Sequence, residues 1–470
     1  MSQVRLVGLD FGTTTSSAIV ASAVLSQNAV TGRQELTSVH ELFRSEPIFT
    51  PFSEAGLDAD RLRVHLDHWL EAGRGSGEEI FGGGALVTGL AAQERNAAAL
   101  IDLIRSRCRG AFVAIAGDPC LESWVAFHAS ASAISRAHPE RYVVNLDIGG
   151  GTTNIALGKN GEVVRIGSLF VGARHVEVVP GTYCITRLSQ FAQGLFEHLG
   201  ITRKPGDSLD VAEVTAILDF YLDLIECALA GRADAFHEPI GRLHQQVPFE
   251  PGVSLADAIV TVSGGVGELV YSHLAGRDLP STTSFGDLGI DLAQRLEASS
   301  YLAPSLRAFV PASAGRATVY GLLRHATQVS GNTLFLPDPA VLPLRDLPIF
   351  GRLTGHSTDE QIQDTLHRVS RSLSGGCVGI AIENASAATL AEFGSRMARS
   401  LKAIGFPATR PLVLLVQENV GKALGQYATE WGRMPLRIVV VDEIMIRDAR
   451  FVQIGLMQNQ VVPISFYGMI

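Results

Sequence analysis

Two short stretches of the sequence combine an aspartate with a turn rich in glycine and threonine. They read LDFGTTTSS at residues 9–17 and LDIGGGTTN at residues 146–154. Backbone N–H groups and hydroxyls around such a turn form a concave set of donors that binds phosphate oxygens. Two carboxylates that face each other across a cleft hold Mg²⁺ mostly through its water ligands. The repeat therefore predicts a clamp that grips a magnesium–polyphosphate complex from two sides.

Both turns are set in the same context, because each aspartate directly follows an apolar run and closely precedes glycine. Aligned without gaps, Asp10 coincides with Asp147, and both are expected to hold hydrated Mg²⁺. A single aspartate of this kind is more often an ordinary turn residue that bonds its own backbone. Two in matching contexts favour a shared role. The residues expected to contact phosphate are Gly12, Thr13, Thr14, Gly149, Gly150, Gly151 and Thr152.

A third stretch, VTVSGGVGEL at residues 260–269, supplies the remaining part of a nucleotide site. Gly264 and Gly265 have no Cβ, so the backbone can lie close against a flat ring. The N-terminus of a helix that begins here would add polar groups. Ser263, Gly264 and Gly265 are therefore expected to approach an adenosine, although two glycines alone also suit a plain turn between a strand and a helix.

The turns need flanking strands and helices, and the surrounding pattern predicts them. The expected strands include residues 4–9, a partner through residues 18–20, a repeat of this pair from Tyr142 onward, and a hairpin turn at residues 159–161. The expected helices are residues 97–107, residues 207–231, one beginning at Pro119 and one of small residues within 315–336. The glycine-rich residues 76–84 are expected to be a flexible connection, and the proline-rich residues 337–348 a linker or an edge segment.

Bulk composition excludes several classes of protein. The chain has 470 residues, 46% of them hydrophobic, so it can bury the cores of more than one domain. A net charge of −9, without a run of basic residues, argues against a nucleic-acid surface. No run approaches the ~18 apolar residues of a membrane span, and no secretory signal is visible. Five cysteines without a C-x-x-C pair suit reduced thiols, so we expect a cytoplasmic protein.

The three stretches, in this order, resemble the phosphate-1, phosphate-2 and adenosine motifs of the actin/Hsp70/sugar-kinase ATPase superfamily. The resemblance implies an α/β fold of two related lobes that close over ATP and Mg²⁺, and helices near Pro119 and Gly315 that connect them. It also implies catalytic roles for Asp10 and Asp147, and Asp118 and Glu122 would border the cleft. It covers about residues 1–330, with lobe one at about 1–140 and lobe two at about 141–330, and leaves 331–470 as an additional C-terminal α/β domain.

A narrower resemblance runs nearly the whole length of the chain. The segments EPIFTPF, LVTGLAAQERNA, AGDPCLESWVAFHA, RATVYG, VQENVGKALGQ, VVVDEIMIRDARFVQIG and VVPISF are similar to those of the ethanolamine ammonia-lyase reactivating factors. This resemblance implies an ATP-dependent chaperone that releases damaged cobalamin from ethanolamine ammonia-lyase, so that intact adenosylcobalamin can rebind. Its pathway implies an ethanolamine-utilisation microcompartment in a bacterial cytoplasm, and a homodimer is compatible with the sequence.

Other functions of the same nucleotide clamp stay open at this stage, because a fold does not name a reaction. A sugar or polyol kinase would need a carboxylate base beside the substrate hydroxyl, and no polyol-binding set is evident. An actin-type filament would use ATP to control assembly. Activators of acyl-CoA dehydratases need cysteines for a shared iron–sulfur cluster, and none follows the second turn in a suitable pattern.

Overall fold

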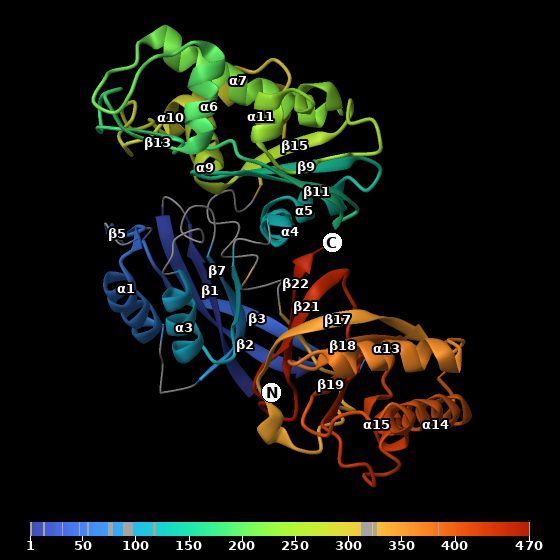
Figure 1. Cartoon of the computed structure of the whole chain (residues 1–470). Helices are drawn as coiled ribbons and strands as arrows, with labels where there is room; N and C mark the ends of the chain where they lie inside the picture. The colour runs from blue at the N-terminus through green and yellow to red at the C-terminus, as the bar shows by residue number, and fades with distance from the viewer. Residues whose placement is uncertain are drawn as a thin grey trace.

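The computed structural model describes residues 2–12, 15–30, 32–46, 48–53, 56–73, 79–87, 97–115, 119–311, 322, 327–383 and 385–469. Figure 1 shows three parts. We call residues 2–115 lobe one, residues 119–311 lobe two and residues 327–469 the C-terminal domain. Lobe two, in green, lies above the blue lobe one, and the orange-to-red C-terminal domain lies beside lobe one (Figure 1). Within the described part of the chain, no helix has both the length and the apolar character of a bilayer span.

Lobe one contains a six-stranded sheet in the order β3-β2-β1-β7-β8, with β4 beside β2. β1 runs antiparallel to β2 and parallel to β7. Alternate side chains of β1 point to opposite faces, so Leu9 packs under α1 and α3 while Leu6 faces the C-terminal domain. The elements are β1 (Ser2–Phe11), β2 (Thr15–Gln27), β3 (Gln34–Arg44), β4 (Ile48–Phe49), β5 (Phe52–Ser53), β6 (Gly56–Leu57), α1 (Ala59–Ala72), β7 (Ile80–Val87), α3 (Ala97–Arg107) and β8 (Phe112–Ile115).

Lobe two repeats this arrangement in a five-stranded sheet of order β14-β11-β10-β9-β15. β9 is antiparallel to β10 and parallel to β15, as β1 is to β2 and β7. The first elements are α4 (Pro119–Ser130), α5 (Ser132–Ala137), β9 (Tyr142–Ile148), β10 (Thr153–Lys159), β11 (Glu162–Leu169), β12 (Val176–Val178), β13 (Ile185–Leu188) and α6 (Gln190–Leu199). The others are α7 (Val211–Leu229), η1 (Ala233–Phe236), α8 (Pro239–Leu243), β14 (Gln245–Val247), β15 (Ile259–Ser263), α9 (Gly264–Leu274), α10 (Gly289–Ala298) and α11 (Ala303–Ala308).

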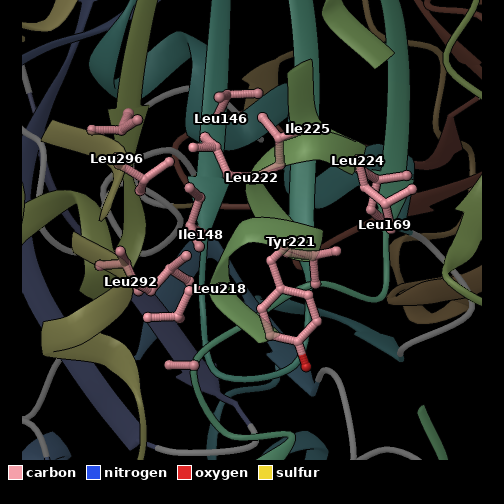
Figure 2. Close-up of a cluster of buried hydrophobic side chains, with 14 of the residues drawn as sticks. Leu146, Ile148, Leu169, Leu218, Tyr221, Leu222, Leu224, Ile225, Leu292 and Leu296 are labelled. Carbon is pink, nitrogen blue, oxygen red and sulfur yellow. The ribbon is translucent and has the colours of Figure 1, made fainter. Parts of the chain in front are cut away.

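The two faces of the lobe-two sheet have different covers. Figure 2 shows one face, where leucines of α7 and α10 interlock with side chains of the strands. Burial of one such leucine contributes about 2 kcal/mol, so this face anchors the lobe. On the other face, Phe127 of α4 packs against Val143 and Ala156. Asp147 alternates with the core residue Leu146 and therefore lies on the face of α4.

The C-terminal domain contains a seven-stranded sheet in the order β16-β22-β21-β17-β18-β19-β20. Strands β17 to β20 are parallel, and α13, α14 and α15 cover one face of them. Its elements are β16 (Thr327–Val329), η2 (Pro339–Val341), β17 (Leu344–Thr354), α13 (Asp359–Arg371), β18 (Gly376–Ala381), α14 (Ala387–Ala403), β19 (Leu412–Val416), α15 (Gly421–Ala428), β20 (Ile438–Val441), β21 (Ala449–Ile454) and β22 (Pro463–Met469).

The second face of this sheet packs against the rest of the molecule. Val413 and Leu415 share one core with Phe112 of lobe one and with Leu121 and Val125 of α4. In Figure 1, α4 lies at the base of lobe two next to β22. α4 is therefore a helix between two bodies, with one side on the lobe-two sheet and the other in the core of the C-terminal domain.

Polar contacts hold the C-terminal domain to lobe one. The backbone N–H of Gly83 donates to Thr327 Oγ1 over 3.0 Å, and Gln453 Nε2 donates to the carbonyl oxygen of Ala111 over 3.0 Å. Arg105 forms an ion pair of 2.8 Å with Asp346. These contacts span more than 200 positions in sequence, so lobe one and the C-terminal domain form one interlocked unit.

Several predicted elements are confirmed. A helix occupies Ala97–Arg107, another begins at Pro119, and α7 lies within the expected residues 207–231. The hairpin turn between β10 and β11 has Asn160 and Gly161 at positive φ, as a tight turn of this kind requires.

The flexible connection predicted over residues 76–84 is wrong for its second half, because Ile80–Val87 is the buried strand β7. Residues 74–78 lie outside the described part of the chain. The glycines serve close packing here. A Cβ at Gly84 would lie 2.3 Å from the ring of Phe112, and a Cβ at Gly83, with φ of 102°, would lie 1.9 Å from the carbonyl oxygen of Val7.

Two expectations near the C-terminal domain also need correction. Residues 344–348 are not a linker or an edge, because β17 lies between β21 and β18 inside the sheet. Pro348 is tolerated there because register shifts on either side interrupt the ladder. Within the predicted small-residue helix, Thr327–Val329 is the strand β16, and residues 315–321 and 323–326 lie outside the described part of the chain.

Candidate functional site

The two hairpins place their aspartates in equivalent positions. Asp10 pairs with Ser17 across β1 and β2, and Asp147 pairs with Asn154 across β9 and β10. Each aspartate thus has its cross-strand partner seven positions later. Because the two sheets also share strand order, the sequence repeat corresponds to a repeat of three-dimensional structure.

Asp10 occupies an unusual electrostatic position. Its side chain is only partly exposed, and within the described residues it has no hydrogen bond or ion pair. Burial, and then the negative charge of Asp147, raise the pKa of Asp10 to about 7. The second cause shows that the two carboxylates share one region of the molecule. A pair of this kind gains from a cation between its members.

Asp147 is buried and held from the third predicted stretch. Ser263 lies directly opposite Asp147 on the parallel strand β15, and its Oγ donates to Asp147 Oδ1 over 2.6 Å. The side-chain amide of Asn145 donates to the same Ser263 Oγ over 2.8 Å. Ser130 of α4 in turn donates to Asn145 Oδ1 over 3.0 Å. A hydrogen-bonded chain therefore runs from α4 to the predicted metal ligand.

The glycine turn at residues 149–152 is braced by the chain that follows β11. Gly149 N donates to the carbonyl oxygen of Thr152 over 2.9 Å, which closes the turn. Ala173 N donates to Gly149 O over 3.0 Å, and Arg174 N donates to Gly150 O over 2.6 Å. A Cβ at Gly172 would lie 2.6 Å from Gly150 O, so glycine is required for this approach. Gly149, Gly150, Gly151 and Thr152 are partly exposed, as a ligand-binding turn needs.

The first turn is described less completely. Gly12 is partly exposed, and its carbonyl oxygen accepts a hydrogen bond of 2.7 Å from Thr50 Oγ1. Thr13 and Thr14 lie outside the described residues, and so do Asp118, Gly315 and the motif residues 88–96 and 316–321. The predicted roles of Thr13 and Thr14 remain predictions.

Gly264 and Gly265 differ in what they approach. Gly264 has φ of 78°, and a Cβ there would lie 2.6 Å from the carbonyl oxygen of Ile148. Its need for glycine therefore comes from β9. Gly265 has nothing within 4 Å of the corresponding position, so this glycine leaves open space at the start of α9. Of the two, Gly265 better fits the predicted approach to a ring.

A carboxylate of α4 completes the site. Glu122 is buried and accepts a hydrogen bond from the side-chain amide of Asn154, the residue that pairs with Asp147. Asn154 Oδ1 in turn accepts a hydrogen bond of 2.8 Å from Ser168. The sequence suggested Glu122 only through family geometry, and it missed Asn145 and Asn154. The signal for both asparagines was a polar residue inside an apolar strand.

His175, which the sequence indicated to be structural, lies beneath the glycine turn. It is buried, and its Nδ1 is 2.9 Å from Ser189 Oγ. Burial, followed by the neighbouring His244, lowers the pKa of His175 to about 3, so its ring stays neutral near pH 7. His175 therefore supports the turn without adding charge to it.

These features fit a magnesium-bound polyphosphate. Asp10 and Asp147 offer carboxylate oxygens, which Mg²⁺ prefers, and their mutual repulsion would be relieved by a divalent cation. Residues 149–152 expose a turn beside Asp147, and Ser263–Gly265 meet Asp147 from the next strand. The predicted residues that the structure describes are thus gathered around Asp147, except Gly12, which directly follows β1.

Comparisons with known proteins come from sequence and from structure. Residues 2–469 match the profile of the family described as Ethanolamine utilisation protein EutA. Ethanolamine ammonia-lyase reactivase EutA from Salmonella typhimurium is 28% identical over 98% of this chain and 97% of its own. The protein of the same description from Escherichia coli K12 is also 28% identical, over the same shares. A crystal structure of an exopolyphosphatase-like protein, 13% identical, aligns with 69% of this chain and 97% of its own at a TM-score of 0.40.

Proposed function

The chain belongs to the EutA family of ethanolamine utilisation proteins, and from that premise we propose that it reactivates ethanolamine ammonia-lyase. In this proposal the reactivation depends on ATP and Mg²⁺, releases damaged cobalamin from the lyase, and lets intact adenosylcobalamin rebind. Support comes from the two relatives described as reactivases, which align over 97% of their length. We propose that the protein acts beside its client in the bacterial ethanolamine-utilisation microcompartment. We also propose that it acts as a homodimer.

One observation supports the nucleotide site most directly. Asp10 and Asp147 occupy the same position in two hairpins of the same register, and their charges interact. In the proposal these carboxylates hold hydrated Mg²⁺, which supplies charge neutralisation to the phosphates when bound. The turn at residues 149–152 of lobe two binds the β- and γ-phosphates. From lobe one, the turn formed by Gly12, Thr13 and Thr14 also contacts the outer phosphates. Ser263–Gly265 approach the adenosine, and Asp147 orders the water that attacks the γ-phosphate.

For the nucleotide to affect a client, a change at the nucleotide site must alter a distant surface of the protein. Helix α4 connects this site to the C-terminal domain. Its Glu122 and Ser130 are bonded to the strands that carry Asp147, through Asn154 and Asn145 respectively. On its other side, the guanidinium of Arg447 in the C-terminal domain lies 4.2 Å from the ring centroid of Trp124. We propose that lobe closure displaces α4 and thereby the C-terminal domain, which presents the client-binding surface. ATP can drive such a change only if the client binds the two states with unequal affinity.

The test is reactivation of a blocked client. Ethanolamine ammonia-lyase inactivated with cyanocobalamin would be mixed with this protein, ATP, Mg²⁺ and adenosylcobalamin, and deamination of ethanolamine followed. We expect activity to return only when all components are present. Return of activity without ATP, or no return with all components, would contradict the proposal.

Two variants connect the site to that activity. Asp10→Asn and Asp147→Asn keep side-chain volume and remove charge, so we expect loss of both ATP hydrolysis and reactivation with the fold intact. Circular dichroism serves as the control for folding. Full turnover in both variants would remove the two carboxylates from the mechanism.

A further inference from the structure

A nucleotide at this site needs a cation besides the metal. A triphosphate carries more negative charge than one divalent ion neutralises, and Asp10 and Asp147 add to the excess. Lysine, a frequent phosphate ligand, occurs only four times in the sequence. Lys159 ends β10 at the far end from the glycine turn, Lys204 precedes α7, and Lys402 and Lys422 belong to the C-terminal domain. No lysine therefore serves the turn at residues 149–152.

Among the described residues, Arg174 is an arginine whose backbone contacts this turn directly. Its backbone N–H donates to Gly150 O over 2.6 Å, and its neighbour Ala173 bonds Gly149. The side chain of Arg174 therefore begins beside the turn, and its long, flexible stem can take more than one direction. The side chain is 21% exposed, so it has access to solvent as well as to the protein.

One partner of Arg174, Glu177, is shared with another cation. Arg174 Nε lies 3.6 Å from Glu177 Oε1, an ion pair that is longer than a hydrogen bond. Arg187 forms a hydrogen-bonded ion pair with the same Glu177 oxygen. If the guanidinium of Arg174 turned away, Glu177 would keep a counter-charge. Glu177 therefore does not become an unpaired charge when Arg174 contacts a phosphate. The charge of Arg174 also acts on the carboxyl of Asp287, so Glu177 is one of several groups around it.

We propose that Arg174 is the phosphate-binding side chain of this site and leaves Glu177 to contact the terminal phosphate of the bound nucleotide. This inference rests on the proposed function, because it requires a nucleotide at the glycine turn. Arginine suits the task because its planar guanidinium can donate two parallel hydrogen bonds to phosphate. In this arrangement Arg174 distinguishes ATP from ADP, while Asp10 and Asp147 hold the metal.

The test measures dissociation constants of ATP, ADP and AMP, each with Mg²⁺, for the full-length protein. Arg174→Gln should weaken ATP binding roughly 10- to 100-fold, as expected for charge-assisted hydrogen bonds, and ADP binding less. Arg174→Lys should restore part of the loss, because it keeps the charge without the fork. Arg187→Gln removes the counter-charge that Glu177 keeps, so it should weaken ATP binding, but less than Arg174→Gln does. Arg203→Gln is the matched control, since Arg203 pairs with Glu213 and not with Glu177, and its affinities should equal those of the parent.

Glu177→Gln provides a test in the opposite direction. Loss of the carboxylate releases Arg174 from one of its partners, so ATP should bind severalfold more tightly. Equal losses for ATP, ADP and AMP in Arg174→Gln would assign Arg174 a structural role and overturn the inference. Unchanged ATP affinity in that variant would do the same while the proposed function stands. A parent protein that binds no nucleotide would instead overturn the proposed function, and this inference with it.

Discussion

Asp10→Asn should stabilise the nucleotide-free protein at neutral and alkaline pH while it abolishes the proposed ATPase activity. The carboxylate of Asp10 is only partly exposed, lies near Asp147, and has no hydrogen bond from the described residues. Its ionised form is therefore costly in the folded protein and inexpensive in the unfolded chain. Asparagine has the same shape and does not ionise, so the cost disappears.

The structure sets the sign and the size of this effect. The pKa of Asp10 rises from 3.8 to about 7 on folding, mainly through burial. Between these values the folded state retains a proton that the unfolded state has lost, so stability falls as pH increases from about 4 to about 7. A rise of the Asp10 pKa from 3.8 to about 7 corresponds to a loss of about 4 kcal/mol of folding free energy when Asp10 is fully ionised. Because the carboxylate keeps some solvent contact, we expect a gain of about 2–4 kcal/mol in the variant at pH 8.

Urea unfolding of parent and variant at pH 5 and pH 8, without nucleotide or Mg²⁺, measures this difference. The gain at pH 5 should be less than half of the gain at pH 8, and other titrating groups cancel in the comparison. Asp147→Asn is the companion variant. It removes the charge that repels Asp10, so it should lower the pKa of Asp10 and move the pH window downward. An Asp10→Asn variant that is less stable at pH 8, or equally shifted at both pH values, would refute the reasoning.

Three further predictions concern other parts of the molecule. Gly264→Ala should cost about 1–3 kcal/mol of folding free energy, because it strains a positive φ and brings a Cβ against a carbonyl oxygen of β9. Gly265→Ala should leave stability nearly unchanged and weaken nucleotide binding. Urea unfolding and titration with ATP distinguish the two variants. In the parent protein, the depressed pKa of His175 should make stability fall as pH decreases from 6.5 towards 3, because the unfolded chain binds a proton that the folded protein does not. In urea unfolding, His175→Gln should reduce this dependence of stability on pH. Tyr467→Phe should lower the free energy of unfolding by about 1–2 kcal/mol, because Tyr467 donates a hydrogen bond of 2.5 Å to Asp346. An unchanged midpoint of thermal unfolding would contradict this role of the hydrogen bond.

Sequence reasoning succeeded where local chemistry and local structure agree. An aspartate between an apolar strand and a glycine turn needs no tertiary information to be placed at a strand end, which is why the positions of Asp10 and Asp147 near the ends of β1 and β9 could be predicted. Their duplication predicted two related lobes, and the shared strand order confirms them. Pro119 marked the start of α4 because proline is well suited to the first turn of a helix.

It failed where packing between distant segments decides the outcome. Glycines in β7 resemble a flexible connection by composition, but each permits the approach of a residue that sequence alone cannot bring near, as Phe112 does at Gly84. Pro348 indicated an edge because proline lacks an N–H, and only the register shifts of β17 show how an interior strand accepts it. Asn145 was invisible as a site residue because its partners, Ser130 and Ser263, lie 15 and 118 positions away.

The position of the C-terminal domain follows from the same two-fold repeat. In lobe two, the sheet face that carries Asp147 is covered by α4. In lobe one, the corresponding face of β1 contacts Val329 and Val461 of the C-terminal domain. Each aspartate-bearing face therefore has a cover, and the two covers meet where Leu121 of α4 enters the core of the C-terminal domain. Any rotation of one lobe against the other must pass through this contact, since the C-terminal domain is interlocked with lobe one. In the proposed mechanism, this contact is the route by which a movement of lobe two reaches the C-terminal domain.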